Sequence, residues 1–381
     1  MKLHSKWLFV SAAVIAVMAV SGCSSGDDTT ANAGSSAATG GNPNAAAAAA
    51  YVAQVEASPT GIGYNSPITG TAPTGINAAI LENSTAVNQR TDQELEHALK
   101  DLGWNYTVVP IGNGAEDPAT AFDQALDAKP DIVFYSGYSS AQFSAQLARA
   151  GQMGVKAVAS CINDPATSVL IGVVCDPASR DLSAKATASY IAAHGTGSDH
   201  VQLYVSSTFP IDQAYGESFQ KWMTQLCPGC EVTSNSFQIS DIGTKLPGDV
   251  VSAVQRDPKT NYVIFCFGDA MTGVVPALDA VGLTSQVTLG GGIPGTEQYA
   301  RLKAGDSDFW FQDNTPWISY RFADIAVRNL LGEDTGVVTN APLVSQLLTK
   351  DNINTAVFSS DGYWLGYNGY NADYLKQWGL K

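Results

Sequence analysis

The stretch INAAILENSTAVNQRTDQELEHALKDLGWNYTVV, residues 76–109, combines two short apolar segments with a longer helical one. The outer segments, Ile76–Leu81 and Tyr106–Val109, have the length and composition of strands. Between them, Gln89–Leu102 carries apolar residues at three- and four-residue spacing, which predicts a helix that Gly103 ends. The stretch therefore predicts a strand–helix–strand unit.

The same alternation continues along the chain to about residue 340. Further strands are predicted at Ile132–Tyr135, Val155–Ser160, Val169–Val174, Val201–Val205, Val232–Phe237, Tyr262–Phe267, Val287–Leu289 and Phe309–Gln312. Helices are predicted from Asp117 and at Ser140–Met153, Ser179–His194, Tyr215–Leu226, Pro247–Arg256, Met271–Val281, Thr296–Ala304 and Trp317–Leu331. Alternating strands and helices at this spacing predict an α/β fold with doubly wound parallel sheets covered by helices on both faces.

Length and composition limit the function classes. The 381 residues predict two domains at roughly 100–200 residues each. With 20 basic and 35 acidic residues the net charge is −15, which argues against a nucleic-acid partner. Four histidines leave little material for a histidine-rich metal site, HExxH and P-loop motifs are missing, and GxSxG does not occur after residue 26. We therefore expect neither an enzyme nor a bound cofactor or metal.

The N-terminus has the pattern of a secretion signal. Lys2 and Lys6 are basic, and Trp7–Val20 is apolar but too short to span a bilayer. The sequence VSGC that follows, ending at Cys23, resembles the bacterial lipobox, in which the cysteine carries the lipid. Residues 1–22 are thus expected to be a lipoprotein signal peptide, with lipid on Cys23 holding the protein to the extracytoplasmic membrane face. An ordinary signal peptide with a stray cysteine is the alternative.

Two segments separate this signal from the body of the protein. Residues 23–44 contain small and polar residues without a large apolar side chain, which is typical of a disordered tether. Residues 45–75 form a lead-in that begins with an alanine-rich short helix and continues in a segment rich in Pro, Gly and Thr.

Several short motifs, taken in their order and spacing, resemble one family. These are ALKDLGWN (98–105), AGQMGV (150–155), YGESF (215–219), GDAM (268–271), LGGG (289–292) and YLKQWG (374–379). Together they resemble the type I periplasmic binding proteins, the ribose/galactose-binding solute receptors of ABC importers. The resemblance implies two doubly wound lobes joined by a three-segment hinge, with the ligand in the cleft between them.

The resemblance also implies boundaries for the two lobes. The first lobe is expected to contain residues 76–161 plus 292–313, and the second residues 162–291 plus 314–340, followed by a C-terminal extension, 341–381. The chain is then expected to cross between lobes near Cys161–Asp164, Gly290–Ile293 and Asp313–Pro316.

Polar and aromatic residues at strand ends are the candidate ligand-binding residues, because the carboxyl ends of the strands meet at the cleft. The candidates are Asn83, Asn88, Gln89, Tyr138, Asn163, Phe209, Gln213, Phe267, Asp269 and Asp313. Such residues also serve as helix caps, and Asp269 is placed to be one.

Three candidate positions depart from the sugar-receptor pattern. Gln213 stands where those receptors place an arginine, while Phe267 and Gly291 or Gly292 stand where they place an asparagine and an aspartate. The change from charged, forked partners to aromatic faces favours a ligand that is less polar than a free sugar and carries an aromatic or otherwise apolar portion, although a sugar remains the family default. An alignment error of one or two residues would remove this argument.

The glycine-rich run at residues 290–295 matches GxGxxG and is followed by Asp313. A dinucleotide site is therefore an alternative, but Pro294 interrupts the run and the helix after it is short.

The remaining cysteines suggest disulfides. Cys227 and Cys230 flank a Pro-Gly turn, and an oxidising envelope location favours a disulfide there over a metal site. Cys161 and Cys175 are candidates for a second pair, which the sequence leaves open. Cys266 lies in an apolar strand and is expected to be a buried free thiol.

The sequence thus predicts a monomeric, lipid-anchored substrate-binding protein of an ABC importer, with a small-molecule ligand and a membrane permease as partners. A ligand-sensing lipoprotein receptor is the alternative, and an extracytoplasmic enzyme on the same fold is less favoured.

Overall fold

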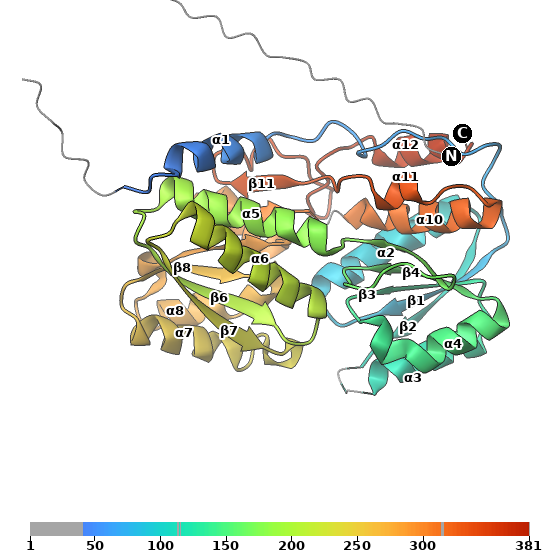
Figure 1. Ribbon diagram of the computed structural model, residues 1–381, viewed down its shortest axis with the longest axis horizontal. Helices are drawn as coiled ribbons and strands as arrows, with labels where there is room; N and C mark the ends of the chain where they lie inside the picture. Colours follow the sequence, from blue (N-terminus) through green and yellow to red (C-terminus); the bar gives the residue numbers. More distant parts are fainter. Residues whose placement is uncertain (1–40, 113, 115, 314–315, 381) are drawn as a thin grey trace, which may run out of the picture. The chain divides into compact units, whose positions relative to one another are not determined.

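The first strand–helix–strand stretch forms a parallel β–α–β unit in the computed structural model of the protein (Figure 1). Strands β1 (Asn77–Glu82) and β2 (Asn105–Pro110) are joined by helix α2 (Ala86–Asp101). Leu95 and Leu99 of α2 are fully buried, as their helical spacing in the sequence predicts.

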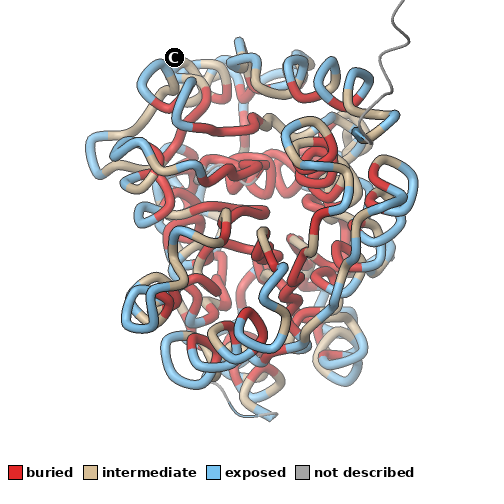
Figure 2. The backbone as a smooth tube through the Cα atoms, turned by 90° about the vertical axis from the view of Figure 1, so that its left-hand side faces the viewer, coloured by how far each residue is buried: buried red, intermediate tan, exposed pale blue. Residues whose placement is uncertain are grey.

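The structure describes residues 41–112, 114, 116–313 and 316–380. The expected signal peptide, Cys23 and most of the expected tether lie outside these residues. Among the described residues, buried positions gather in the strands and on the inward faces of the helices (Figure 2).

The first lobe is built on a five-stranded parallel sheet of order β2-β1-β3-β4-β5. Its other strands are β3 (Ile132–Ser136), β4 (Lys156–Ser160) and β5 (Leu170–Val174). Helices α2 and α10 (Ser319–Leu331) cover one face, while α3 (Asp117–Asp127) and α4 (Ser144–Met153) cover the other (Figure 1).

The second lobe is built on a six-stranded sheet of order β11-β10-β9-β8-β6-β7, in which β11 runs antiparallel to β10. Its strands are β6 (His200–Ser206), β7 (Glu231–Phe237), β8 (Thr260–Phe265), β9 (Thr288–Gly292), β10 (Phe309–Gln312) and β11 (Gln346–Thr349). Its helices are α5 (Pro177–His194), α6 (Pro210–Leu226), α7 (Leu246–Arg256), α8 (Val274–Asp279) and α9 (Thr296–Ala304). Strand β11 was not predicted from the sequence.

The lobe boundaries differ from those expected. Strand β5 pairs with β4 in the first sheet, although it was expected in the second lobe. Strand β10 pairs with β9 in the second sheet, and α10 packs on the first lobe, each opposite to expectation. The expected boundaries were wrong because a parallel strand has the same sequence pattern in either sheet, and only hydrogen-bond pairing decides its lobe.

The crossings move with these boundaries. Residues 161–164 join β4 to β5 within the first lobe. Residues 290–293 lie at the end of β9, before α9, within the second lobe, so neither segment crosses between lobes. The chain crosses instead after β5, after β10, and between α11 (Gly336–Thr339) and β11. The expected crossing that begins at Asp313 is therefore the one that agrees with the sheet pairing.

Segments at both ends of the body contact both lobes. Helix α1 (Ala45–Val55) packs against α5 of the second lobe, and the chain then runs along the first lobe to β1. After β11, the C-terminal extension returns to the first lobe, where α12 (Tyr370–Gln377) and Trp378 join its hydrophobic core. The ring of Trp378 stacks on Tyr320 with centroids 5.7 Å apart.

The described residues contain two disulfides, Cys161–Cys175 and Cys227–Cys230, and Cys266 is a buried free thiol. The first disulfide joins the ends of β4 and β5, and Cys175 lies where the chain leaves the first lobe. The second lies close to Asp199, but cysteines paired with each other offer no thiolate to a metal ion.

Candidate functional site

A cavity lies between the two lobes at the carboxyl ends of their strands, and we call it the central cavity. The first lobe contributes Asn83, after β1, and Asn88, on the first turn of α2. The second lobe contributes Arg180, Phe209 and Phe267, from α5 and from the ends of β6 and β8. The volume of the central cavity is about 60 Å³.

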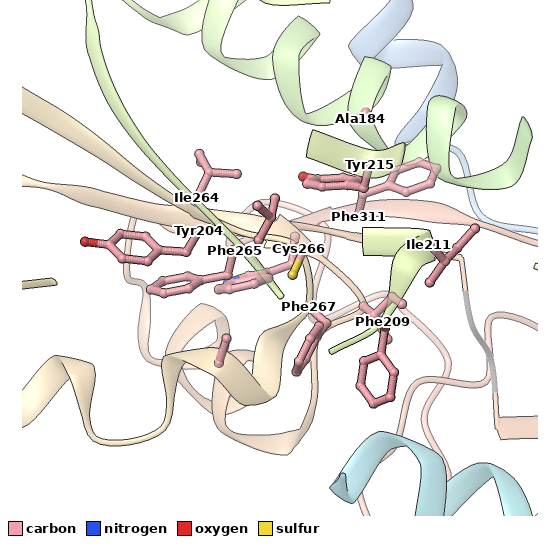
Figure 3. Close-up of a cluster of buried hydrophobic side chains, with 14 of the residues drawn as sticks. Ala184, Tyr204, Phe209, Ile211, Tyr215, Ile264, Phe265, Cys266, Phe267 and Phe311 are labelled. Atoms are coloured by element: carbon pink, nitrogen blue, oxygen red, sulfur yellow. The ribbon is translucent and has the colours of Figure 1, made fainter. Parts of the chain in front are cut away.

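Two phenylalanine rings form the apolar wall of the central cavity. Phe209 and Phe267 both line this cavity, and their side chains point to the same side in Figure 3. Tyr138 of the first lobe contacts Phe209 edge to face, with ring centroids 5.6 Å apart. Gly137 has φ +86°, and a Cβ there would lie 2.9 Å from the Phe209 ring, so glycine lets the lobes approach.

A fully buried arginine also lines the central cavity. Arg180 Nη2 donates a hydrogen bond of 2.6 Å to the carbonyl oxygen of Cys266, and its guanidinium lies 4.8 Å from the centre of the Tyr215 ring. Its nitrogens lie 3.5 Å from an Asp313 oxygen and 3.8 Å from an Asp212 oxygen. One cation therefore lies between two buried carboxylates.

Several buried atoms of this cluster have no hydrogen-bond partner among the described residues. They are Nε and Nη1 of Arg180, Oδ2 of Asp212, both carboxylate oxygens of Asp313 and Oδ1 of Asn88. A buried polar atom without a partner costs about 1–3 kcal/mol. Of these residues, Arg180, Asp212 and Asn88 line the central cavity, and a ligand that offers both donors and acceptors, as hydroxyl groups do, suits their unpaired atoms.

Burial raises the pKa of Asp212 to about 6 and that of Asp313 to about 6, although the Arg180 charge opposes the change. Burial also raises the pKa of Asp269. Each of these carboxyls binds its proton more tightly in the folded chain than in the unfolded chain, where its pKa is ordinary. Their contribution to stability therefore falls as pH rises through about 6.

We expect the protein to melt at a higher temperature at pH 5.5 than at pH 7.5. The buried carboxyls of Asp92, Asp308 and Asp324 have raised pKa values and act in the same direction, while the lowered pKa values of Asp257 and Asp361 act in the opposite one. Thermal unfolding followed by circular dichroism checks this expectation. Asp212→Asn with Asp313→Asn is expected to flatten the pH dependence, and a melting temperature that rises with pH would contradict it.

The residues expected from the sequence fall into three groups. Asn83, Asn88, Phe209 and Phe267 line the central cavity. Asp313 contacts Arg180, Tyr138 contacts Phe209, and Asp269 lines an adjoining cavity, where it accepts a hydrogen bond of 3.2 Å from the Val87 amide. Gln89, Asn163 and Gln213 are exposed and lie outside the cavity lining, contrary to expectation.

Gln213 lies one position along the chain from a residue that lines the cavity. Its side chain donates a 2.5 Å hydrogen bond to the Ser206 carbonyl, while the preceding Asp212 lines the cavity. Successive residues of a helix point about 100° apart, so one position decides which side chain faces the ligand. Arg180 was also missed, and its signal is its spacing with Ala184, Thr187 and Ile191 on the buried face of α5.

The glycines at residues 290–292 of the run that suggested a dinucleotide site are needed because neighbouring atoms leave little room for a Cβ. A Cβ at Gly291 would lie 1.9 Å from the Phe265 carbonyl oxygen, on the neighbouring strand. A Cβ at Gly292 would lie 3.4 Å from Arg180 Nη1 and 3.0 Å from Ser183 Oγ. The run therefore lets two strands and the arginine approach closely.

Known structures share this architecture. GanP, described as a glucose-galactose binding protein from Geobacillus stearothermophilus, is 15% identical and aligns over 74% of this chain and 99% of its own, with a TM-score of 0.62. A solute binding protein from Thermotoga lettingae, described as a 5-methylthioribose transporter component in complex with that compound, is 13% identical over 74% and 90%, with a TM-score of 0.64. A protein described as the fructose binding periplasmic domain of a hybrid two component system is 12% identical over 73% and 92%, with a TM-score of 0.63. At these identities the likeness establishes the fold.

None of the curated proteins matches this chain. Within the described residues, no helix is both long enough and apolar enough to cross a membrane. Residues 79–334, more than half of the chain, match the family described as periplasmic binding protein domain. This match and the two-lobed topology confirm the resemblance seen in the sequence: the chain belongs to the periplasmic binding protein family and has the type I fold.

Proposed function

We propose that this protein is the lipid-anchored, extracytoplasmic substrate-binding protein of an ABC importer, and that it delivers a small solute to a membrane permease. The observation that carries the proposal is the central cavity, where residues of both lobes surround unpartnered polar atoms of Arg180, Asp212 and Asn88. Membership in a family of solute-binding proteins, rather than enzymes, supports it.

A sugar or sugar-like molecule is the ligand that this lining favours. The rings of Phe209 and Phe267 offer apolar faces, while Arg180 and Asp212 offer charged partners for hydroxyl groups. The sequence favoured a less polar ligand because charged partners for hydroxyl groups were not expected in the cleft. Arg180 and Asp212 are such partners, so that argument no longer holds. Similar structures are described as binding glucose-galactose and 5-methylthioribose, the second of which carries an apolar substituent.

Native mass spectrometry of the purified, unrefolded protein tests this function by giving the mass of any retained solute. Titration calorimetry with that solute, or with D-glucose, D-galactose and D-ribose, then measures affinity. Phe267→Ala is expected to weaken binding about tenfold or more, because it removes one aromatic face of the cavity. Gln89→Ala, at an exposed position outside the cavity, is the control, and equal affinity of both variants would contradict the proposal.

A ligand-sensing lipoprotein receptor is the second candidate, favoured by the similarity to the periplasmic domain of a two component system. Deleting the gene distinguishes the two. Loss of solute uptake supports the importer, whereas intact uptake with loss of a solute-induced transcriptional response supports the sensor. Conversion of the bound solute to a product would support an enzyme instead.

We expect Cys23→Ala to release the protein from the membrane without changing its fold, because the lipid proposed on Cys23 is then missing. Membrane fractionation after a salt wash checks this. The double variant Cys227→Ala/Cys230→Ala is the control and is expected to stay in the membrane fraction, since its cysteines pair with each other. Retention of Cys23→Ala in membranes would contradict the proposed lipid site.

A further inference from the structure

A second cavity adjoins the central one, and we call it the side cavity. Val87 and Thr91, on the first turns of α2, line both cavities. The side cavity has a volume of about 170 Å³, against about 60 Å³ for the central cavity. The side cavity therefore adds free space to the cleft beyond the central cavity.

The C-terminal extension supplies one wall of the side cavity, through Tyr363. This residue lies in a turn closed by the β-bridge between Phe358 and Trp364. The Phe358 ring packs edge to face on Tyr299 of α9, with centroids 5.1 Å apart, which holds the turn on the second lobe.

The same turn is also held on the first lobe. Arg90 of α2 forms an ion pair of 3.2 Å with Asp361, and its guanidinium lies 4.9 Å from the centre of the Tyr363 ring. Tyr370, further along the extension, donates a hydrogen bond of 3.3 Å to Glu94. Tyr363 is therefore fixed at the border of the two lobes rather than carried on a free tail.

The lining of the side cavity combines an aromatic side chain with hydrogen-bonding groups of both kinds. Asp269 and Glu297 offer acceptor oxygens, and Arg90 offers donors. Two acids and one arginine are among these residues, so an anionic ligand group is disfavoured in the side cavity. An uncharged ring that carries hydroxyl groups fits this lining, because it has an apolar face for tyrosine and hydroxyls for the charged residues.

We propose that the ligand spans both cavities, and that it is a disaccharide-sized glycoside whose second ring packs on Tyr363. This inference rests on the proposed function, since it extends the solute site of the central cavity. It assigns a recognition role to the C-terminal extension, which lies beyond the residues that match the family.

Calorimetric titration with matched sugars tests the proposal. The probes are maltose, cellobiose, lactose and melibiose, with D-glucose and D-galactose as their single-ring counterparts. At least one disaccharide is expected to bind about tenfold more tightly than either monosaccharide. Tyr363→Ala is expected to lower that disaccharide affinity about tenfold, equivalent to about 1.4 kcal/mol, and to leave monosaccharide affinity unchanged.

Two variants separate this inference from the proposed function. Tyr367→Ala removes a tyrosine of the same extension that lies outside the side cavity, and it is expected to change neither affinity. Phe267→Ala is expected to lower the affinity for monosaccharides and disaccharides alike, because Phe267 lines the central cavity.

If a monosaccharide binds as tightly as every disaccharide, or more tightly, the proposal that the ligand has a second ring would be wrong. An unchanged disaccharide affinity in Tyr363→Ala, or an equal loss for both kinds of sugar, would overturn the role of Tyr363. In each of these cases a loss in Phe267→Ala would leave the proposed function standing. A panel in which no sugar binds, with no solute retained by the purified protein, would overturn both proposals.

Discussion

Arg180→Met is expected to lower the free energy of unfolding at pH 7.5 by about 3–5 kcal/mol, because it leaves two buried carboxylates without their cation. Asp212 and Asp313 are both nearly inaccessible to solvent, and Arg180 is the basic group that forms ion pairs with them among the described residues. Ligand binding is expected to be lost as well, since the same guanidinium lines the central cavity. Urea denaturation followed by fluorescence measures the stability.

Controls identify charge as the cause. Arg149→Met, at a half-exposed arginine that pairs with Asp123 and Asp127, is expected to cost about 0–1 kcal/mol. Adding Asp212→Asn and Asp313→Asn to Arg180→Met is expected to recover part of the loss. The loss is also expected to shrink at pH 5, where the carboxyls bind protons. An Arg180→Met protein as stable as the parent at pH 7.5 would contradict this account.

Gly291→Ala is expected to lower the free energy of unfolding by about 4 kcal/mol or more, a loss confined to a few severe mechanisms. Gly291 has φ +144°, and the added Cβ would lie 1.9 Å from the carbonyl oxygen of Phe265. These two residues are partners in the pairing of β8 with β9, so the methyl group would force the strands apart. Thermal and urea unfolding measure the effect.

Gly248→Ala is the matched control. Gly248 lies exposed in α7, and a Cβ there would meet no atom within 4 Å. Alanine favours helix over glycine, so this variant is expected to be at least as stable as the parent. Equal stability of Gly291→Ala and Gly248→Ala would show that the strands accommodate the methyl group.

The secondary structure could be predicted because its signals are local. The helix predicted at Thr296–Ala304 has those bounds in the structure, and the strand predicted at Phe309–Gln312 matches β10. By contrast, the predicted helix Met271–Val281 contains only the shorter α8, since Gly273, with φ +78°, separates α8 from a 3-10 turn. β11 was missed because it follows the alternation of strands and helices and joins the sheet as an antiparallel edge strand, which that alternation does not predict.

The candidate site was predictable to the extent that strand ends converge. Phe209 and Phe267 follow parallel strands of one sheet, and parallel strands end at one edge, so their proximity followed from their positions. Gln213 failed because a helical position is decided by rotation about the helix axis, which an approximate alignment does not give. Arg180 was missed because it lies within α5, which begins at Pro177, and only residues near strand ends were considered.

The sequence by itself determined the alternation of strands and helices, the two-lobed family and the aromatic wall of the central cavity, because each depends on local periodicity or on an ordered set of motifs. Only the tertiary structure decided which lobe holds β5, β10 and α10, because identical periodicity allows either sheet and hydrogen-bond pairing selects one. It also decided that Arg180 lies between Asp212 and Asp313. These three residues come from separate parts of the chain, and their proximity, which no local pattern encodes, makes their buried charges depend on one another.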